Sequence, residues 1–421
     1  MGVTRRGFLR AGGLSLLASA CAPTSLPAAV SGLPARASAA GGDRRSDATP
    51  NRAYVGSPGD PLLVTVFLRG GADGLHLVPP FGDRGYERLR GSLSLSETLP
   101  FAKGFGLHPE LAPLEPLVER GELAVVHAVG STHPTRSHFE AQDFMEWGRP
   151  DAFRTKDGWL ARALRDVAGE NAFALLALTS QLPLTLRGSE AFAIDDPGRF
   201  GIPGASRAAR GALVQMYAAS GGDPVGSAGS RALDALAEVE RVTRRRSSRR
   251  RSATRRAGAE LTSAVEQLVA FEAAGLPLRA VFLESSGWDT HQGQGTTGGA
   301  MARAVRDLGE AIARLRTAAE GRRDWLVVVM TEFGRTVRPN GSRGTDHGHG
   351  SVMLVAGARV RGGLYGDWPG LDESRLHEGR DLPVTTDYRS VLAEVLRAHL
   401  GAPPPPDTFP DFVPTGLGLV A

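Results

Sequence analysis

Apolar runs of strand length alternate with longer amphipathic stretches along most of the chain. The apolar runs are Pro61–Leu68, Glu122–Ala128, Leu278–Glu284, Trp325–Met330 and Val352–Ala356. Nearly continuous apolar segments of this length are typical of strands that are buried on both faces of a parallel sheet. The segments Phe139–Trp147 and Ala300–Ala319 are helical in character, and the second carries apolar residues at helical spacing. The alternation predicts an α/β fold with a mostly parallel central sheet and helices on both faces.

The amino-terminal region has the pattern of an export signal. Thr4–Arg10 contains a twin-arginine motif, and a short, weakly apolar run follows at 11–20. We therefore expect residues 1–21 to be a twin-arginine signal peptide that is recognised by the twin-arginine export machinery. The chain would then be periplasmic, secreted or attached to the cell envelope by a lipid. Small residues before Cys21 fit either a cleavage site or a lipoprotein box, and both alternatives remain open.

The remaining sequence divides into a tether and one large domain. Residues 22–58 are rich in Ala, Ser, Pro and Gly, which predicts a flexible tether. Residues 59–421 are long enough to bury a large core, and we expect them to form a single α/β domain. Cys21 is the only cysteine in the chain, so this domain has no thiolate with which to bind a metal.

Polar side chains gather where the predicted strands end. They are Asp73, Ser137, His138, Asp289, His291, Glu332, Asp346, His347 and His349. Open α/β sheets bind ligands at the carboxyl ends of their strands, so we expect these turns to open on one edge of the sheet. Carboxylate oxygens and imidazole nitrogens together suit divalent cations such as Zn²⁺, Mn²⁺, Mg²⁺ or Ca²⁺. The pattern predicts a metal-dependent hydrolase.

A basic run occupies residues 241–256, with nine arginines and no acidic residue. Without those arginines the formal net charge of +4 would become −5, so the rest of the protein is mildly acidic. The run could bind an anionic envelope surface, or it could be a solvated insertion. No aromatic residues are interleaved for base stacking, and we do not expect a nucleic-acid partner.

Several long motifs make the chain similar to a known family. They are VFLRGGADGL, FGLHPELAPL, HAVGSTHPTRSHFEAQDF, SGWDTHQGQ, TEFGRTVRPNGSRGTDHGHGSVMLVAG and VRGGLYGDWPGL. Together they resemble the domain of unknown function 1501 family, whose mostly exported bacterial members are placed near sulfatases in the alkaline-phosphatase superfamily. The resemblance covers about Leu62 to Gly401. It implies an alkaline-phosphatase-like or sulfatase-like fold with one or two metal ions.

The resemblance also implies roles for particular residues. The metal ligands would be Asp73, Asp289, His291, Glu332 and one of His347 and His349. The superfamily commonly has an Asp-His pair where this chain has Glu332 and Phe333, so one imidazole is missing and His138 or Asp346 could replace it.

The resemblance implies a nucleophile and an anion-binding group as well. Ser137 is the candidate nucleophile, because it opens a helix whose free N–H groups would stabilise an anion. Thr132 is the rival candidate, and a helix-capping role for Ser137 remains the alternative. Arg136 or Arg335 would bind the ester oxygens.

We therefore expect an exported hydrolase of a phosphate or sulfate ester, either a small molecule or a glycan, with Ser137, Arg136 and His138 at its catalytic centre. The alternative is a non-catalytic cell-envelope scaffold or glycan-binding protein that keeps the fold and a structural cation.

Overall fold

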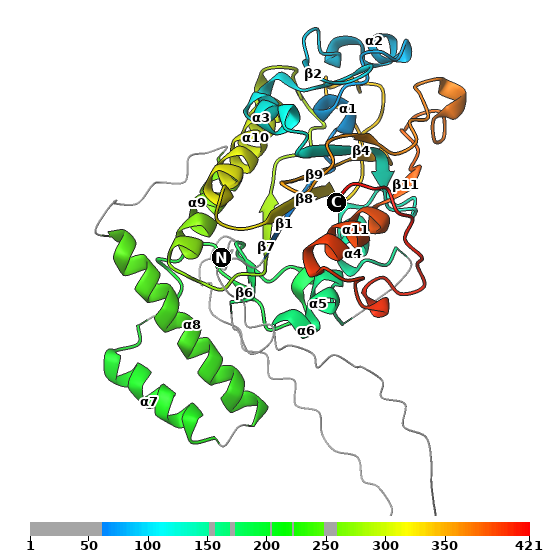
Figure 1. Ribbon diagram of the computed structural model, residues 1–421. Helices are drawn as coiled ribbons and strands as arrows, with labels where there is room; N and C mark the ends of the chain where they lie inside the picture. The colour runs from blue at the N-terminus through cyan, green and yellow to red at the C-terminus, as the bar shows by residue number, and fades with distance from the viewer. Residues whose placement is uncertain (1–60, 151–155, 169–172, 203, 221–222, 248–258) are drawn as a thin grey trace, which may run out of the picture. The chain divides into compact units, whose positions relative to one another are not determined.

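The computed structural model describes residues 61–150, 156–168, 173–202, 204–220, 223–247 and 259–421 (Figure 1). All of them belong to one compact unit, Arg52–Ala421. The predicted signal peptide at 1–21, with Cys21, and the predicted tether at 22–58 lie outside the described residues. Of the basic run at 241–256, residues 241–247 form the end of a helix and the others lie outside the described residues.

A large central sheet forms the middle of the unit. Its strands are β1 (Leu62–Leu68), β4 (Leu123–Gly130), β5 (Leu175–Ala177), β6 (Phe192–Ala193), β7 (Ala280–Ser285), β8 (Trp325–Thr331), β9 (Ser351–Gly357), β10 (Gly363–Tyr365) and β11 (Thr386–Asp387). Their order is β10-β4-β9-β8-β1-β7-β5-β6, and β11 also pairs with β4. Among the strands of this sheet in the described residues, only β9 runs antiparallel to its neighbours, β4 and β8. The predicted mostly parallel sheet is confirmed.

Helices connect and cover the strands. They are α1 (Gly74–Leu77), α2 (Gly85–Arg90), α3 (Glu115–Glu119), α4 (His138–Trp147), α5 (Trp159–Ala163), α6 (Arg165–Ala168), α7 (Arg207–Ala218), α8 (Pro224–Ser247), α9 (Glu260–Ala273), α10 (Gly299–Ala319) and α11 (Tyr388–Leu400). A small hairpin, β2 (Leu99–Ala102) and β3 (Phe105–Leu107), forms a second sheet. Among the described residues, no helix combines the length and apolar composition needed to cross a bilayer.

The sheet separates two hydrophobic cores. Alternate residues of β1 face opposite sides, so that Val64 and Val66 pack in one core whereas Leu63 and Phe67 pack in the other. The first core includes apolar residues of α9 and α10, and the second includes those of α5 and α11. Figure 1 shows these two groups of helices on opposite sides of the sheet. Because both faces are covered, β1, β8 and β9 each have a single polar residue, and β7 has polar residues only at its end, Glu284 and Ser285.

The direction of the strands determines where the loops lie. β1 pairs in parallel with both β7 and β8, so the carboxyl ends of these three strands lie at one edge of the sheet. Because β9 is antiparallel, the segment 332–350 leaves β8 at this edge and enters β9 at the same edge. β4 is antiparallel to β9, and it therefore also ends there. Four loops far apart in sequence thus meet at one edge.

Candidate metal centre

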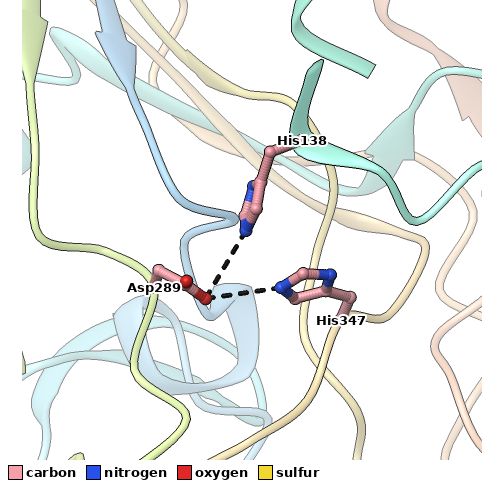
Figure 2. Close-up of side chains that lie close together, drawn as sticks. All are labelled: His138, Asp289 and His347. Carbon is pink, nitrogen blue, oxygen red and sulfur yellow. Dashed lines mark hydrogen bonds and ion pairs between the residues drawn. The ribbon is translucent and has the colours of Figure 1, made fainter. Parts of the chain in front are cut away.

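Three histidines and an aspartate lie together at this edge. Asp289 and His291 follow β7, His347 lies in the segment between β8 and β9, and His138 is the first residue of α4, after β4. Figure 2 shows His138 and His347 directed at the carboxylate of Asp289. One ligand atom from each of these three residues lies within 4.8 Å of the other two.

The Nε2 atoms of all three imidazoles converge on one oxygen. From Asp289 Oδ1, Nε2 of His291 is 3.1 Å away, that of His347 is 3.4 Å away and that of His138 is 3.5 Å away. The Nε2 atoms of His291 and His347 are only 2.8 Å apart. Three imidazole nitrogens therefore approach one carboxylate oxygen, and the ligand atoms of His138, Asp289 and His347 are close enough to share an ion.

The opposite nitrogen of each ring has a partner of its own. Nδ1 of His347 is 2.8 Å from the carbonyl oxygen of Arg136, which can only accept, so this Nδ1 carries the proton. Nδ1 of His291 is 2.9 Å from Asp346 Oδ1, and Nδ1 of His138 is 2.8 Å from Glu332 Oε1. When the rings are neutral, each therefore presents a lone pair at Nε2. Two lone pairs 2.8 Å apart repel each other unless a cation lies between them, and three imidazoles with one carboxylate suit Zn²⁺ and similar ions.

Glu332 lies behind His138, with a fully buried side chain. It accepts hydrogen bonds from Gln142 Nε2 at 2.9 Å and from the backbone N–H of Gly70 at 2.8 Å, as well as from His138. Burial acts to raise the pKa of Glu332, but the hydrogen bonds from His138 and Gln142 lower it overall. The same contact raises the pKa of His138. Glu332 therefore orients an imidazole, as carboxylates behind metal-binding histidines commonly do.

Asp346 has the corresponding position behind His291. Asn340 Nδ2 donates to Asp346 Oδ1 at 2.9 Å, and it also donates to the carbonyl oxygen of His291 at 2.9 Å. The hydrogen bonds from Asn340 and His291 lower the pKa of Asp346. Asp346 is thus a charged acceptor that fixes the ring of His291.

Arg335 fixes the carboxylate at the centre of the cluster. Its guanidinium is buried and donates to Asp289 Oδ1 at 2.5 Å, to the carbonyl of Gly71 at 2.7 Å and to that of Thr345 at 2.9 Å. Burial acts to raise the pKa of Asp289, but the hydrogen bond and the charge of Arg335 lower it overall. Arg335, which the sequence suggested as an ester-binding group, is thus directed at Asp289 and backbone carbonyls, and its side chain is fully buried.

Four predicted ligands are not among the converging atoms: Glu332 and Asp346 lie behind His138 and His291, whereas Asp73 and His349 lie outside the cluster. Asp73 is buried and forms an ion pair with Arg90, and it accepts from Gln294 Nε2 at 2.7 Å. The ring of His349 stacks on that of His377, with centroids 4.6 Å apart, and burial lowers the pKa of His349 to about 4. The structure therefore groups neither Asp73 nor His349 with Asp289.

The predicted catalytic segment precedes α4. Ser137 is the N-cap residue of α4, and its side chain makes no capping hydrogen bond. Arg136 Nη2 pairs with Glu378 and Asp381, each at 2.7 Å, whereas Arg136 Nε is buried and makes no hydrogen bond. Its carbonyl, by contrast, orients His347. Thr132 is exposed.

Phe333 occupies the position of the imidazole that the superfamily pattern would have. Its buried ring packs against both His138 and His347, with ring centroids 4.9 Å apart in each case. An apolar ring therefore fills the space beside the two imidazoles.

Sequence reasoning missed several residues that support the cluster. Gln142 could have been found, because it lies four residues after His138 and therefore on the same face of α4. Asn340 and Gln294 could not be predicted from the sequence, because a single amide side chain in a loop belongs to no helical or strand pattern. Their roles depend on which loops meet.

Comparisons with known proteins give a family and remote structural similarities. No curated protein matches the sequence significantly. The C-terminal periplasmic domain of EcEptC from Escherichia coli, in a complex with Zn, is 11% identical with a TM-score of 0.34, and the match covers 72% of this chain and 73% of that one. Ps i-CgsB is 12% identical with a TM-score of 0.36, and the match covers 84% of this chain and 74% of that one.

These structural similarities are remote, whereas the family match extends over most of the sheet and the cluster. The family model described as "Protein of unknown function (DUF1501)" matches residues 125–402, which include all four residues of the cluster. The chain therefore belongs to the DUF1501 family.

Proposed function

We propose that the chain is an exported, metal-dependent hydrolase of a phosphate or sulfate ester, of the alkaline-phosphatase and sulfatase type. The observation that carries the proposal is the convergence of three imidazole Nε2 atoms on Asp289, with each Nδ1 bonded to a separate acceptor. His138, His291, His347 and Asp289 would hold one divalent cation. The resident ion would act as a Lewis acid toward the ester oxygens and the attacking group.

The charges of the cluster fit a divalent cation. Three carboxylates, those of Asp289, Glu332 and Asp346, contact the imidazoles. One positive charge, that of Arg335, lies against them, in an ion pair with Asp289. With neutral imidazoles, this set of residues has two uncompensated negative charges, equal and opposite to the charge of the ion.

The cluster is also accessible to a substrate. The side chain of Asp289 is 47% exposed and that of His291 is 39% exposed, whereas Glu332 behind them is fully buried. A ligand would therefore approach from the side of the β7 loop. The amino terminus of α4 would present backbone N–H groups to an anionic ester, and Ser137 would supply the attacking hydroxyl.

The first test compares two neighbouring histidines. In the purified protein we expect about one equivalent of Zn²⁺ or a similar ion, together with turnover of an aryl phosphate or an aryl sulfate. The variant His347→Ala should lose both ion and turnover. The matched control, His349→Ala, should keep both, because His349 lies outside the cluster. Metal content is measured by mass spectrometry, and a native protein with neither ion nor turnover would refute the proposal.

The second test concerns the nucleophile. Ser137→Ala should retain the ion but lose at least about 100-fold in kcat, because the attacking hydroxyl is removed while the metal ligands are unchanged. Thr132→Ala is the matched control for the rival hydroxyl and should retain activity. If Ser137→Ala is fully active, Ser137 is not the nucleophile.

A second candidate function has one observation in its favour. Both arginines that could have bound an ester, Arg136 and Arg335, are occupied by carboxylates and carbonyl groups. A cell-envelope scaffold or glycan-binding protein with a structural cation would have no need of a free guanidinium. In that case the native protein would contain the ion and would hydrolyse neither ester. For either function, we infer export through the signal at 1–21, and the run at 241–256 would contact an anionic envelope surface.

A further inference from the structure

A buried amide joins the two loops that supply most of the cluster. Gln294 is fully buried. Its Oε1 accepts from the hydroxyl of Thr290 at 2.9 Å and from that of Thr345 at 2.8 Å. Its Nε2 donates to Asp73 Oδ2 at 2.7 Å. The amide thus makes three hydrogen bonds to three separate segments of the chain.

The two threonines are adjacent to the ligands. Thr290 lies between Asp289 and His291, and Thr345 directly precedes Asp346 and His347. The backbone N–H of Thr345 also donates to the carbonyl of Thr290 at 3.1 Å. A shift of either threonine would therefore change the 2.8 Å separation between Nε2 of His291 and Nε2 of His347.

A buried ion pair fixes the orientation of the amide. Arg90 pairs with Asp73 Oδ2, and its guanidinium also donates to the carbonyls of Thr336 and Val337, each at 3.3 Å. Asp73 can only accept when ionised, so it must face the NH₂ group of Gln294. The amide oxygen is consequently directed at the two hydroxyls. A flipped amide would place oxygen against oxygen in a buried setting.

We propose that Gln294 is a positioning residue that sets the separation of His291 and His347, and thereby the affinity and the coordination geometry of the ion. The proposal rests on the metal centre of the proposed function but not on hydrolysis. Gln294 acts through Thr290 and Thr345 and does not contact the ion. Asp73, which the sequence suggested as a ligand, acts in the same network by holding the amide.

The test replaces the amide with a side chain of similar length. Gln294→Met removes all three hydrogen bonds and keeps most of the volume. We measure the Zn²⁺ dissociation constant by competition with a chromophoric chelator, the visible absorption of the Co²⁺-substituted protein, and the unfolding of the metal-free protein in urea. We expect at least about tenfold weaker Zn²⁺ binding and an altered Co²⁺ spectrum, as for other residues that orient metal ligands.

The matched control is Gln267→Met. Gln267 is half-buried on α9 and donates to the carbonyl of Asp195 at 3.2 Å, with no contact to either loop. The Gln267→Met variant should have the native Zn²⁺ affinity and the native Co²⁺ spectrum.

Several results would overturn the proposal. A folded Gln294→Met protein that binds Zn²⁺ within twofold of the native affinity, with the native Co²⁺ spectrum, would show a purely structural role. If Gln294→Met does not fold, Thr290→Val and Thr345→Val decide the question, because each removes one hydroxyl from the amide oxygen. Unchanged affinity in both would overturn the proposal, and weakened affinity in either would support it. A native protein that binds no ion would instead refute the metal centre itself.

Discussion

At the scale of single residues, hydrogen bonding decides which nitrogen of each histidine faces the cluster. His138, His291 and His347 each use Nδ1 for an acceptor, so their Nε2 atoms face Asp289. His127 shows the opposite case. Its Nε2 donates to the carbonyl of Val78 at 3.1 Å and its Nδ1 accepts from the N–H of Ala128 at 3.1 Å, so that neither nitrogen is available to an ion. Burial of this ring lowers its pKa to about 4.

The buried His127 predicts a pH dependence of stability. In the unfolded chain a histidine has a pKa of about 6.5, so between pH 6.5 and about 4 the unfolded state binds a proton that the folded state does not. The contribution of His127 to stability is therefore constant above pH 6.5 and falls by about 3 kcal/mol as the pH decreases through this window. Urea unfolding of the metal-free protein at several pH values measures the slope. This slope gives the number of protons that the chain takes up on unfolding. In the His127→Gln variant that number should be smaller by about one between pH 6.5 and 4. Equal numbers in the two proteins would contradict a lowered pKa for His127.

At the scale of elements, the apolar runs predicted β1, β4, β7, β8 and β9 within one or two residues at most ends. Runs of this kind are reliable because strands that are buried on both faces admit few polar residues. The short strands β5, β6, β10 and β11 gave no recognisable pattern. Two or three residues are too few for a period, and these strands form because a longer neighbour offers backbone partners.

The approach of the β7 loop and the segment before β9 gives a prediction at this scale. A Cβ on Gly344 would lie 2.3 Å from the carbonyl oxygen of Thr290 and 2.4 Å from that of His291. Gly344→Ala should therefore push the two ligand loops apart, weaken Zn²⁺ binding by at least about tenfold and destabilise the fold by about 1–3 kcal/mol. Calorimetric titration and urea unfolding measure the two effects.

Gly341 provides the matched control for this substitution. It lies in the same segment, but a Cβ there would meet nothing within 4 Å. Gly341→Ala should bind Zn²⁺ as the native protein does. Equal effects of the two substitutions would show that general disturbance of the segment, rather than the close approach, is responsible.

At the scale of the whole molecule, the ion would join segments from three parts of the chain. The ligands follow β4, β7 and β8, and Asp289 also forms an ion pair with the buried Arg335. A ligand that binds only the folded state stabilises it in proportion to the logarithm of its concentration.

Removal of the ion should therefore lower the stability of the entire unit. With Zn²⁺ at 100 times its dissociation constant, the free energy of unfolding should rise by about 2.7 kcal/mol over the chelated protein. Thermal unfolding with and without a chelator measures this difference, and His347→Ala should show none. A native protein whose unfolding temperature is unaffected by chelation would contradict it.

The sequence by itself determined the sheet, its helical cover, the family and the set of polar residues at the strand ends. These follow from local composition and periodicity, which are properties of short stretches of sequence. Only the tertiary structure decided that His138 lies against Asp289 and that Asp73 pairs with Arg90. It also decided that Arg136 and Arg335 form ion pairs with carboxylates of the protein. The choice of partner depends on which loops meet in the folded chain, and the partners are between 17 and 245 residues apart in the sequence. No local pattern encodes that choice, because its outcome depends on distances that exist only after the sheet has formed.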